Sequence, residues 1–298
     1  MARKKKEKSF SLRNIFAASG LPLMGVLVAG LLFTTYATSG KTDKTQQPPT
    51  GVKRFNMLGN TGLKVSEIGL GAGGLTDPVL VKYSLDNGIN YFDTAETYAR
   101  GKSESAIGEV AAKDRKRMII CTKLNMNGET KQKEILKRYE KSLQRLQTSY
   151  SDILMIHGGN KDAVDNPEIY AAFDQLKKEK KLRFTGVSHH GPNMTKELWP
   201  IVKNRKVDVI LLSYDPAEYA DLKDLLKAAE DKGIGLVAMK VFSSARKAEL
   251  KEFKSGLFPF DQAALRWVLK DPYIDVTIPS MNVLDQIDEY VKASGVEK

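Results

Sequence analysis

Four polar side chains with complementary acid–base chemistry fall at or just after the ends of apolar segments. Asp93 ends one such segment, and Tyr98 follows five residues later. Lys123 and His157 end the next two apolar segments. An ammonium group drawn among apolar residues needs a partner, and the Asp93 carboxylate can supply it. We expect this ion pair to lower the pKa of the neighbouring Tyr98 phenol from its reference value of about 10.

These side chains together could assist the reduction of a carbonyl group by a hydride donor. A phenol next to a Lys–Asp pair can donate a proton to a developing alkoxide near neutral pH. His157 could hydrogen-bond to the same oxygen and orient the carbonyl. Each residue alone has an ordinary structural interpretation, namely an ion pair, a packed aromatic ring or a core histidine. Their conjunction favours a site where a carbonyl carbon accepts hydride.

The segments that must position these side chains alternate between strand-like and helix-like patterns. Short apolar, β-rich runs occur at residues 68–71, 90–93, 118–123, 153–157, 184–188, 207–213, 235–240 and 275–279. Helical spacing lies between them, as at 131–147, 167–181, 219–232, 259–270 and 283–293. Runs that are apolar on both faces and separated by helices are typical of parallel strands. Eight such units in about 245 residues predict an α/β fold, a closed (β/α)8 TIM barrel whose chemistry gathers at the carboxyl ends of the strands.

Two glycine-containing motifs occur near the start of this barrel. Residues 55–58 and 63–65 flank Gly59-Asn60-Thr61-Gly62 and predict an N-terminal β-hairpin that could plug the barrel floor. Residues 69–74 fit the dinucleotide-binding pattern G-x-G-x-x-G, and Asp93 follows 19 residues later. We favour instead a small-residue strand and loop that lets a ligand approach the barrel mouth, because the rest of the chain explains Asp93 better.

The N-terminal region has the pattern of a membrane-directed segment. Residues 1–13 hold six Lys or Arg side chains against Glu7, and residues 14–40 carry no charge. Residues 15–36 can supply the roughly 20 apolar residues of a transmembrane helix. We therefore predict a basic head and a hydrophobic helix in residues 1–40, a linker at 41–53 and the barrel domain at 54–298.

The hydrophobic segment fits either a cleaved signal or a membrane anchor. Ala37-Thr38-Ser39 has the small residues of a signal-peptide cleavage site. Lys41 and Lys44 would mark the end of an uncleaved transmembrane segment. The anchor is slightly favoured. The positive-inside rule then places the barrel on the non-cytoplasmic side, either membrane-anchored or exported.

Composition excludes several classes of site. The net charge is +11, but residues 1–13 hold +5 of it and residues 41–53 hold +2, which leaves +4 for residues 54–298. We therefore expect no nucleic-acid partner. One cysteine and three histidines exclude cysteine-cluster and histidine-rich metal sites, so no metal is expected.

The sequence resembles the aldo-keto reductase family. The segment Asn90-Tyr91-Phe92-Asp93-Thr94-Ala95-Glu96-Thr97-Tyr98, followed by Gly101-Lys102-Ser103-Glu104, is similar to the family signature. Similarity continues through residues 121–123, 142–146, 186–188, 264–268 and 277–279, and covers essentially all of 54–298. The resemblance implies a (β/α)8 barrel, NADPH-dependent carbonyl reduction, and a catalytic tetrad of Asp93, Tyr98, Lys123 and His157.

The resemblance also implies a nicotinamide-binding region, with departures from the family pattern. The expected cofactor-binding residues are Ser188, His189, Met239, Lys240, Ile278, Pro279, Ser280, Met281 and Gln286. His189 stands where the family often has Asn, and Leu211 where it often has Gln. Ser280, Met281 and Gln286 replace the Lys-Ser pair and the Arg that bind a 2′-phosphate in many relatives. A phosphate monoester favours charge-assisted donors, so both NADP and NAD remain open as cofactor.

Two functions are compatible with this sequence. The first is an oxidoreductase that transfers hydride from a nicotinamide cofactor to a small-molecule aldehyde or ketone, with Tyr98 as the general acid. The alternative is a non-catalytic, NAD(P)H-binding redox sensor or partner subunit of a membrane protein. The anchor and the altered nicotinamide contacts motivate the alternative, and the complete tetrad favours the enzyme.

Overall fold

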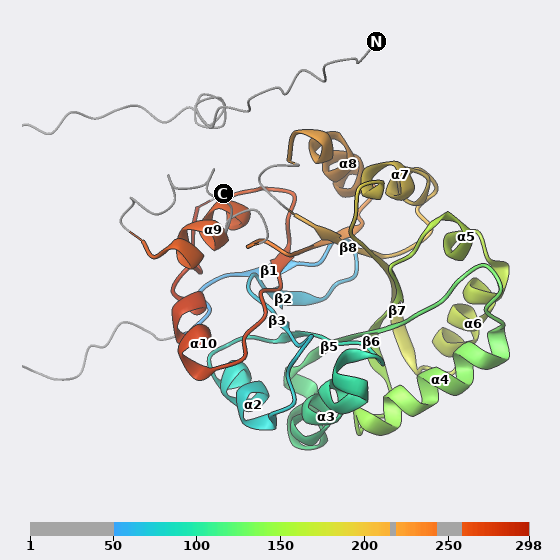
Figure 1. Ribbon diagram of the computed structural model, residues 1–298, viewed down its shortest axis with the longest axis horizontal. Helices are drawn as coiled ribbons and strands as arrows, with labels where there is room; N and C mark the ends of the chain where they lie inside the picture. Colours follow the sequence, from blue (N-terminus) through green and yellow to red (C-terminus); the bar gives the residue numbers. More distant parts are fainter. Residues whose placement is uncertain (1–50, 215–218, 243–257, 298) are drawn as a thin grey trace, which may run out of the picture. The chain divides into compact units, whose positions relative to one another are not determined.

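The protein forms a (β/α)8 barrel-like fold of parallel strands surrounded by helices (Figure 1). The structure, a computed structural model, describes residues 51–214, 219–242 and 258–297. Within these ranges an eight-stranded sheet runs in sequential order from β3 to β10. Its strands are β3 (Leu70–Gly71), β4 (Tyr91–Asp93), β5 (Ile119–Leu124), β6 (Ser151–His157), β7 (Leu182–His189), β8 (Val209–Ser213), β9 (Gly235–Met239) and β10 (Val276–Thr277). Each predicted strand is therefore present.

The two edges of the sheet meet between β3 and β10. Parallel bridges join Ile68 to Thr277 and Gly71 to Ser280. Gly71 is required at this junction, since a Cβ atom there would lie 2.7 Å from the carbonyl oxygen of Ile278. At Gly71 the glycine-rich run thus permits close contact between two strands, a role that was not predicted from the sequence.

Helices follow the strands along the chain and cover the outside of the sheet. They are α2 (Pro78–Asp86), α3 (Lys102–Asp114), α4 (Gln132–Arg145), α5 (Lys161–Val164), α6 (Pro167–Lys178), α7 (Met194–Asn204), α8 (Tyr219–Asp231), α9 (Phe260–Leu269) and α10 (Leu284–Val291), with the 3-10 turns η1 (Tyr98–Gly101) and η2 (Arg115–Arg117). Side-chain caps define where two of these helices begin: Asp77 caps α2 and Asn166 caps α6, each just before a proline.

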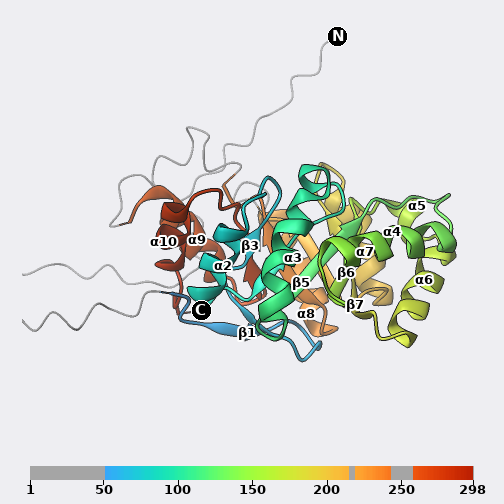
Figure 2. The ribbon, with the colours of Figure 1, turned by 90° about the horizontal axis from the view of Figure 1, so that it is seen from below.

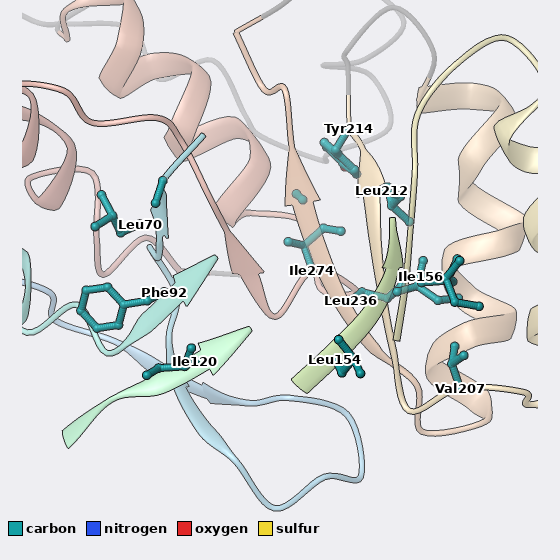
Figure 3. Packing of buried hydrophobic residues seen from close by; sticks show 14 of the residues in the cluster. Leu70, Phe92, Ile120, Leu154, Ile156, Val207, Leu212, Tyr214, Leu236 and Ile274 are labelled. Carbon is teal, nitrogen blue, oxygen red and sulfur yellow. The ribbon is translucent and has the colours of Figure 1, made fainter. Parts of the chain in front are cut away.

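Buried side chains form an outer and an inner hydrophobic cluster. The outer cluster fills the space between strands and helices; Figure 3 shows part of it, including Phe92, Ile120 and Leu154. The inner cluster contains the alternate strand residues, such as Tyr91 and Cys121. This division follows from the period of two along a strand, which sends successive side chains to opposite faces.

The predicted hairpin plugs one end of the barrel. β1 (Phe55–Met57) and β2 (Lys64–Ser66) pair antiparallel, and the hairpin lies along one end of the strands (Figure 2). Leu58, Leu63 and Val65 belong to the inner hydrophobic cluster. The hairpin therefore seals the barrel interior from below, opposite the carboxyl ends of the strands.

The predicted membrane segment, residues 15–36, and the linker up to residue 50 lie outside the described residues. Among the residues that are described, none of the helices combines the length and the apolar character needed to cross a bilayer.

Candidate active site

Three neighbouring strands deliver polar side chains to the carboxyl end of the barrel interior. Along β4 and β5, Asp93 and Lys123 share the parity of the inward-facing Tyr91 and Cys121. On β6, His157 shares the parity of the inward-facing Met155. Because side chains alternate between the two faces of a strand, all three polar groups follow the inner face to its end.

Asp93 and Lys123 form the ion pair that the sequence predicted. The Lys123 Nζ atom donates to Asp93 Oδ1 at 2.5 Å and to the Thr94 carbonyl oxygen at 2.8 Å. Lys123 is only 1% exposed and Asp93 only 2%. Burial alone would lower the pKa of Lys123, but the Asp93 carboxylate outweighs it and holds the pKa well above its ordinary value. Lys123 is therefore a buried ammonium ion.

Tyr98 lies beside this ion pair. Its hydroxyl is 3.5 Å from Lys123 Nζ, and the same Nζ lies 4.7 Å from the centre of its ring. Burial raises the pKa of Tyr98 above its ordinary value, and the Lys123 ammonium offsets this only in part. The expectation that the ion pair lowers this pKa was wrong, because desolvation of the phenolate outweighs the attraction of the ammonium. The phenol is consequently fully protonated at neutral pH.

His157 completes the cluster as a neutral imidazole. Its ring meets the Tyr98 ring edge-on, with centroids 5.6 Å apart. Burial, together with Lys123 and His190, lowers the pKa of His157 to about 4. Within the described part of the chain, its buried Nδ1 atom has no hydrogen-bond partner. Since a neutral imidazole carries one proton, this environment favours the tautomer protonated at Nε2, which can donate a hydrogen bond.

The lowered pKa of His157 predicts a pH-dependent contribution to stability. Unfolded chains take up a proton at this residue below a pH of about 6.5, whereas the folded protein does so only near pH 4. The free energy of unfolding should therefore decrease as the pH falls through this window. His157→Gln should show a smaller decrease in melting temperature between pH 7.5 and 5 than the unsubstituted protein. Equal decreases in the two proteins would contradict the assignment.

A cavity of about 510 Å³ opens from this cluster. Asp93 and Tyr98 line one part of it, and the segments after β9 and β10 line the rest. Its volume lies within the roughly 300–1,000 Å³ typical of small-molecule and cofactor sites. Asp93 Oδ2 is buried without a hydrogen-bond partner among the described residues, which is a feature of sites built for a ligand.

Six of the nine expected cofactor-binding residues line this cavity. These are Met239, Lys240, Ile278, Pro279, Ser280 and Gln286. The other three are absent from the described lining: Ser188 Oγ accepts a hydrogen bond from the Gly158 amide, the His189 Nε2 atom pairs with Glu197, and Met281 is fully buried in the outer hydrophobic cluster.

The cavity also has lining residues outside the expected cofactor-binding set, namely Gly71, Gly73, Val241, Phe242, Asn282 and Tyr290. Val241 and Asn282 each adjoin an expected residue in the chain, and Gly71 and Gly73 lie in the glycine-rich run at residues 69–74. Asn282 lines the cavity where Met281 was expected, and the Asn282 amide donates to Gln286 Oε1 at 2.7 Å. The exposed Lys240 is a charged donor that suits a phosphate-containing ligand at this cavity, so the residues present fit a nicotinamide dinucleotide.

Comparisons with known proteins agree with this geometry. Residues 68–255 match the model of the aldo/keto reductase family. The chain is 30% identical over 276 residues to L-galactose dehydrogenase of Arabidopsis thaliana, covering 79% of this chain and 86% of the relative.

Solved structures show the same architecture. Aldo-keto reductase AKR11C1 from Bacillus halodurans, in its holo form, is 25% identical with a TM-score of 0.67, covering 80% of this chain and 90% of that one. An aldo-keto reductase from Klebsiella pneumoniae in complex with NADPH superposes with a TM-score of 0.67 at 21% identity, over 80% and 88% of the two chains. From the matched family model and these relatives, the chain belongs to the aldo/keto reductase family and is an NAD(P)H-dependent oxidoreductase.

Proposed function

We propose that this protein reduces the carbonyl group of a small-molecule aldehyde or ketone, with Tyr98 as the general acid. The observation that carries the proposal is the position of the Tyr98 hydroxyl, at the cavity and 3.5 Å from a buried ammonium that is paired with Asp93. The non-catalytic alternative is not favoured, because the acid–base groups are complete and a 30% identical relative is named a dehydrogenase.

Each member of the tetrad has a distinct part in the proposed reaction. When bound, the nicotinamide cofactor supplies the hydride. As negative charge develops on the carbonyl oxygen, the Tyr98 hydroxyl transfers its proton to that oxygen and becomes a phenolate. The Lys123 ammonium stabilises the phenolate, and Asp93 holds Lys123 in place. His157, neutral and protonated at Nε2, donates a hydrogen bond that orients the carbonyl.

The raised pKa of Tyr98 is compatible with this role. A protonated phenol is the form that an acid catalyst needs at the start of the reaction. Burial disfavours loss of the Tyr98 proton before the reaction begins. Once the phenolate has formed, the nearby ammonium attracts its negative charge. The buried ion pair therefore stabilises Tyr98 most strongly when negative charge has developed on its oxygen.

The direct test of the proposed function is turnover by the purified full-length protein. We expect oxidation of NADPH or NADH, followed by absorbance, when an activated aromatic aldehyde such as nitrobenzaldehyde is added, and formation of the corresponding alcohol. Tight binding of both cofactors without turnover on a panel of aldehydes, ketones and quinones would contradict the proposal.

Lys240 is expected to contribute to cofactor affinity. It follows β9, lines the cavity, and adopts a left-handed backbone conformation with φ of 59°. Such a conformation is uncommon for lysine and is typical of ligand-binding segments. Because the cofactor is anionic, Lys240→Gln should raise its dissociation constant about fivefold to tenfold, measured by quenching of protein fluorescence. Lys203→Gln, on the outer helix α7, is the matched control and should leave the affinity unchanged.

We also propose that residues 15–36 hold the protein at a membrane, with the barrel on the non-cytoplasmic side. The uncharged apolar run behind a basic head supports this proposal. The full-length protein should remain in the membrane fraction after a carbonate wash. A C-terminal tag should be accessible to protease before the membrane is ruptured, whereas an N-terminal tag should not. Release by the wash, or protection of the C-terminal tag, would contradict the proposal.

A further inference from the structure

A bidentate ion pair ties the segment between Asp93 and Tyr98 to helix α4. Arg138 of α4 donates through Nε to Glu96 Oε2 at 3.1 Å, and its second terminal nitrogen bonds to Glu96 Oε1. The same nitrogen donates to the Asn125 carbonyl oxygen at 2.6 Å. Arg138 therefore joins the loop that carries Tyr98 to the residues that follow Lys123.

Glu96 also contacts β5 directly. Its amide donates to the Lys123 carbonyl oxygen at 3.1 Å, and its Oε1 atom accepts from the Asn125 amide at 3.0 Å. Glu96 is thus hydrogen-bonded to the main chain at positions 123 and 125, in the segment that carries the Lys123 ammonium. Tyr98 lies two residues after Glu96, so these bonds attach the chain to β5 shortly before the phenol.

The backbone on the other side of Tyr98 is strained. Ala99 and Arg100 have φ values of 47° and 57°, followed by Gly101 at 85°. Left-handed conformations are unfavourable for alanine and arginine, and they persist only where the surroundings hold them. A turn of this kind needs fixed attachments, and the Glu96 contacts supply one immediately before Tyr98.

The Arg138–Glu96 pair is largely shielded from solvent. The side chains of Arg138 and Glu96 are 23% and 14% exposed. Hydrogen bonding to Glu96 raises the pKa of Arg138, so the guanidinium stays charged. The same guanidinium also donates to Glu134 at 2.8 Å, but Glu134 is 54% exposed and lies one turn away on the same helix. Arg138 thus has two carboxylate partners. Glu96 is shielded and precedes Tyr98 in the same loop, whereas Glu134 is exposed and lies on α4.

We propose that Glu96 and Arg138 are positioning residues that hold Tyr98 in register with Lys123 for proton transfer. This inference rests on the proposed role of Tyr98 as general acid. Within the described part of the chain, the other hydrogen bonds of the pair reach the main chain at positions 123 and 125 and the Glu134 side chain, so the pair acts through the loop of residues 94–101. A small displacement of a catalytic group is sufficient to lower a rate strongly.

The two carboxylates on Arg138 provide a matched comparison. Glu96→Gln should lower kcat with NADPH and nitrobenzaldehyde about 10-fold to 100-fold, with the dissociation constant of NADPH unchanged. Glu134→Gln removes the same charge from the same guanidinium and should leave kcat within about twofold, because this surface pair contributes little. Equal effects of the two substitutions, or none from Glu96→Gln, would overturn the proposal.

A double substitution separates positioning from general loss of structure. If Glu96 acts through Tyr98, Glu96→Gln should have no further effect on the residual activity of Tyr98→Phe. A damaged fold would instead reduce that residual activity by the same factor as in the unsubstituted protein. Additive effects would therefore overturn the proposal.

A measurement that does not depend on turnover distinguishes this inference from the proposed function. Hydrogen–deuterium exchange of the peptide containing residues 94–101 should accelerate in Glu96→Gln and not in Glu134→Gln. If Tyr98→Phe retains full activity, the proposed function fails whatever this measurement shows. If Tyr98→Phe is inactive but Glu96→Gln changes neither exchange nor kcat, the positioning role alone fails.

Discussion

Tyr98→Phe is expected to lower kcat for carbonyl reduction by about 10²–10⁴-fold, the usual contribution of a general acid. The substitution removes the hydroxyl that lies 3.5 Å from Lys123 Nζ and leaves the ring in place. Because the hydroxyl accepts no strong hydrogen bond from the main chain in the described structure, the fold should be retained. Single-turnover absorbance measurements at saturating cofactor would give the chemical step, and fluorescence quenching would give cofactor affinity.

Tyr150→Phe is a suitable control for this substitution. Tyr150 precedes β6, at the opposite end of the barrel, and stacks on Arg115. Loss of its hydroxyl should leave kcat unchanged. Undiminished turnover in Tyr98→Phe would remove Tyr98 from the mechanism, while a matching loss in Tyr150→Phe would show that any phenol substitution disturbs this protein.

Lys123→Met is expected to affect both stability and activity. The substitution leaves the buried Asp93 carboxylate without its ammonium partner, which typically costs about 3–5 kcal/mol of the free energy of unfolding. It also removes the charge that stabilises the Tyr98 phenolate, so kcat should fall about 10²–10³-fold, as for other preorganised donors. Urea denaturation would give the first quantity and single-turnover kinetics the second.

The double variant Asp93→Asn/Lys123→Met separates these two effects. Replacing both charges removes the uncompensated carboxylate, so most of the lost stability should return. Activity should remain low, because the ammonium is still missing beside Tyr98. Recovery of turnover together with stability would show that the ion pair is structural and takes no part in the reaction.

The strand pattern alone predicted most of the fold. Short apolar, β-rich runs with helical spacing between them identified all eight strands, and the glycine-containing motif at residues 59–62 identified the hairpin. The period of two along each strand explains why Asp93, Lys123 and His157 reach one face at one end of the barrel. Such information is local, because neighbouring residues on a strand must point in opposite directions whatever surrounds them.

Contacts between distant segments could not be predicted in this way. Glu96 and Arg138 are 42 residues apart, and neither lies in a pattern that predicts the other. The pair formed by the buried Glu104 and Arg145, 41 residues apart, likewise emerges only when α3 and α4 pack together. An ion pair depends on the relative placement of helices, which hydrophobic periodicity leaves undetermined.

The sequence by itself determined which residues are candidates for catalysis and at which strand ends they lie. The tertiary structure decided their protonation states and their surroundings. Tyr98 shows the difference: its ammonium neighbour was predictable, but its pKa is raised because burial of the phenol outweighs that neighbour. Met281 and Asn282 show it for the cavity, since after β10 the first side chain is buried in the outer hydrophobic cluster and the second lines the cavity. Desolvation and loop direction depend on atoms from the whole molecule, and one segment of sequence carries no measure of either.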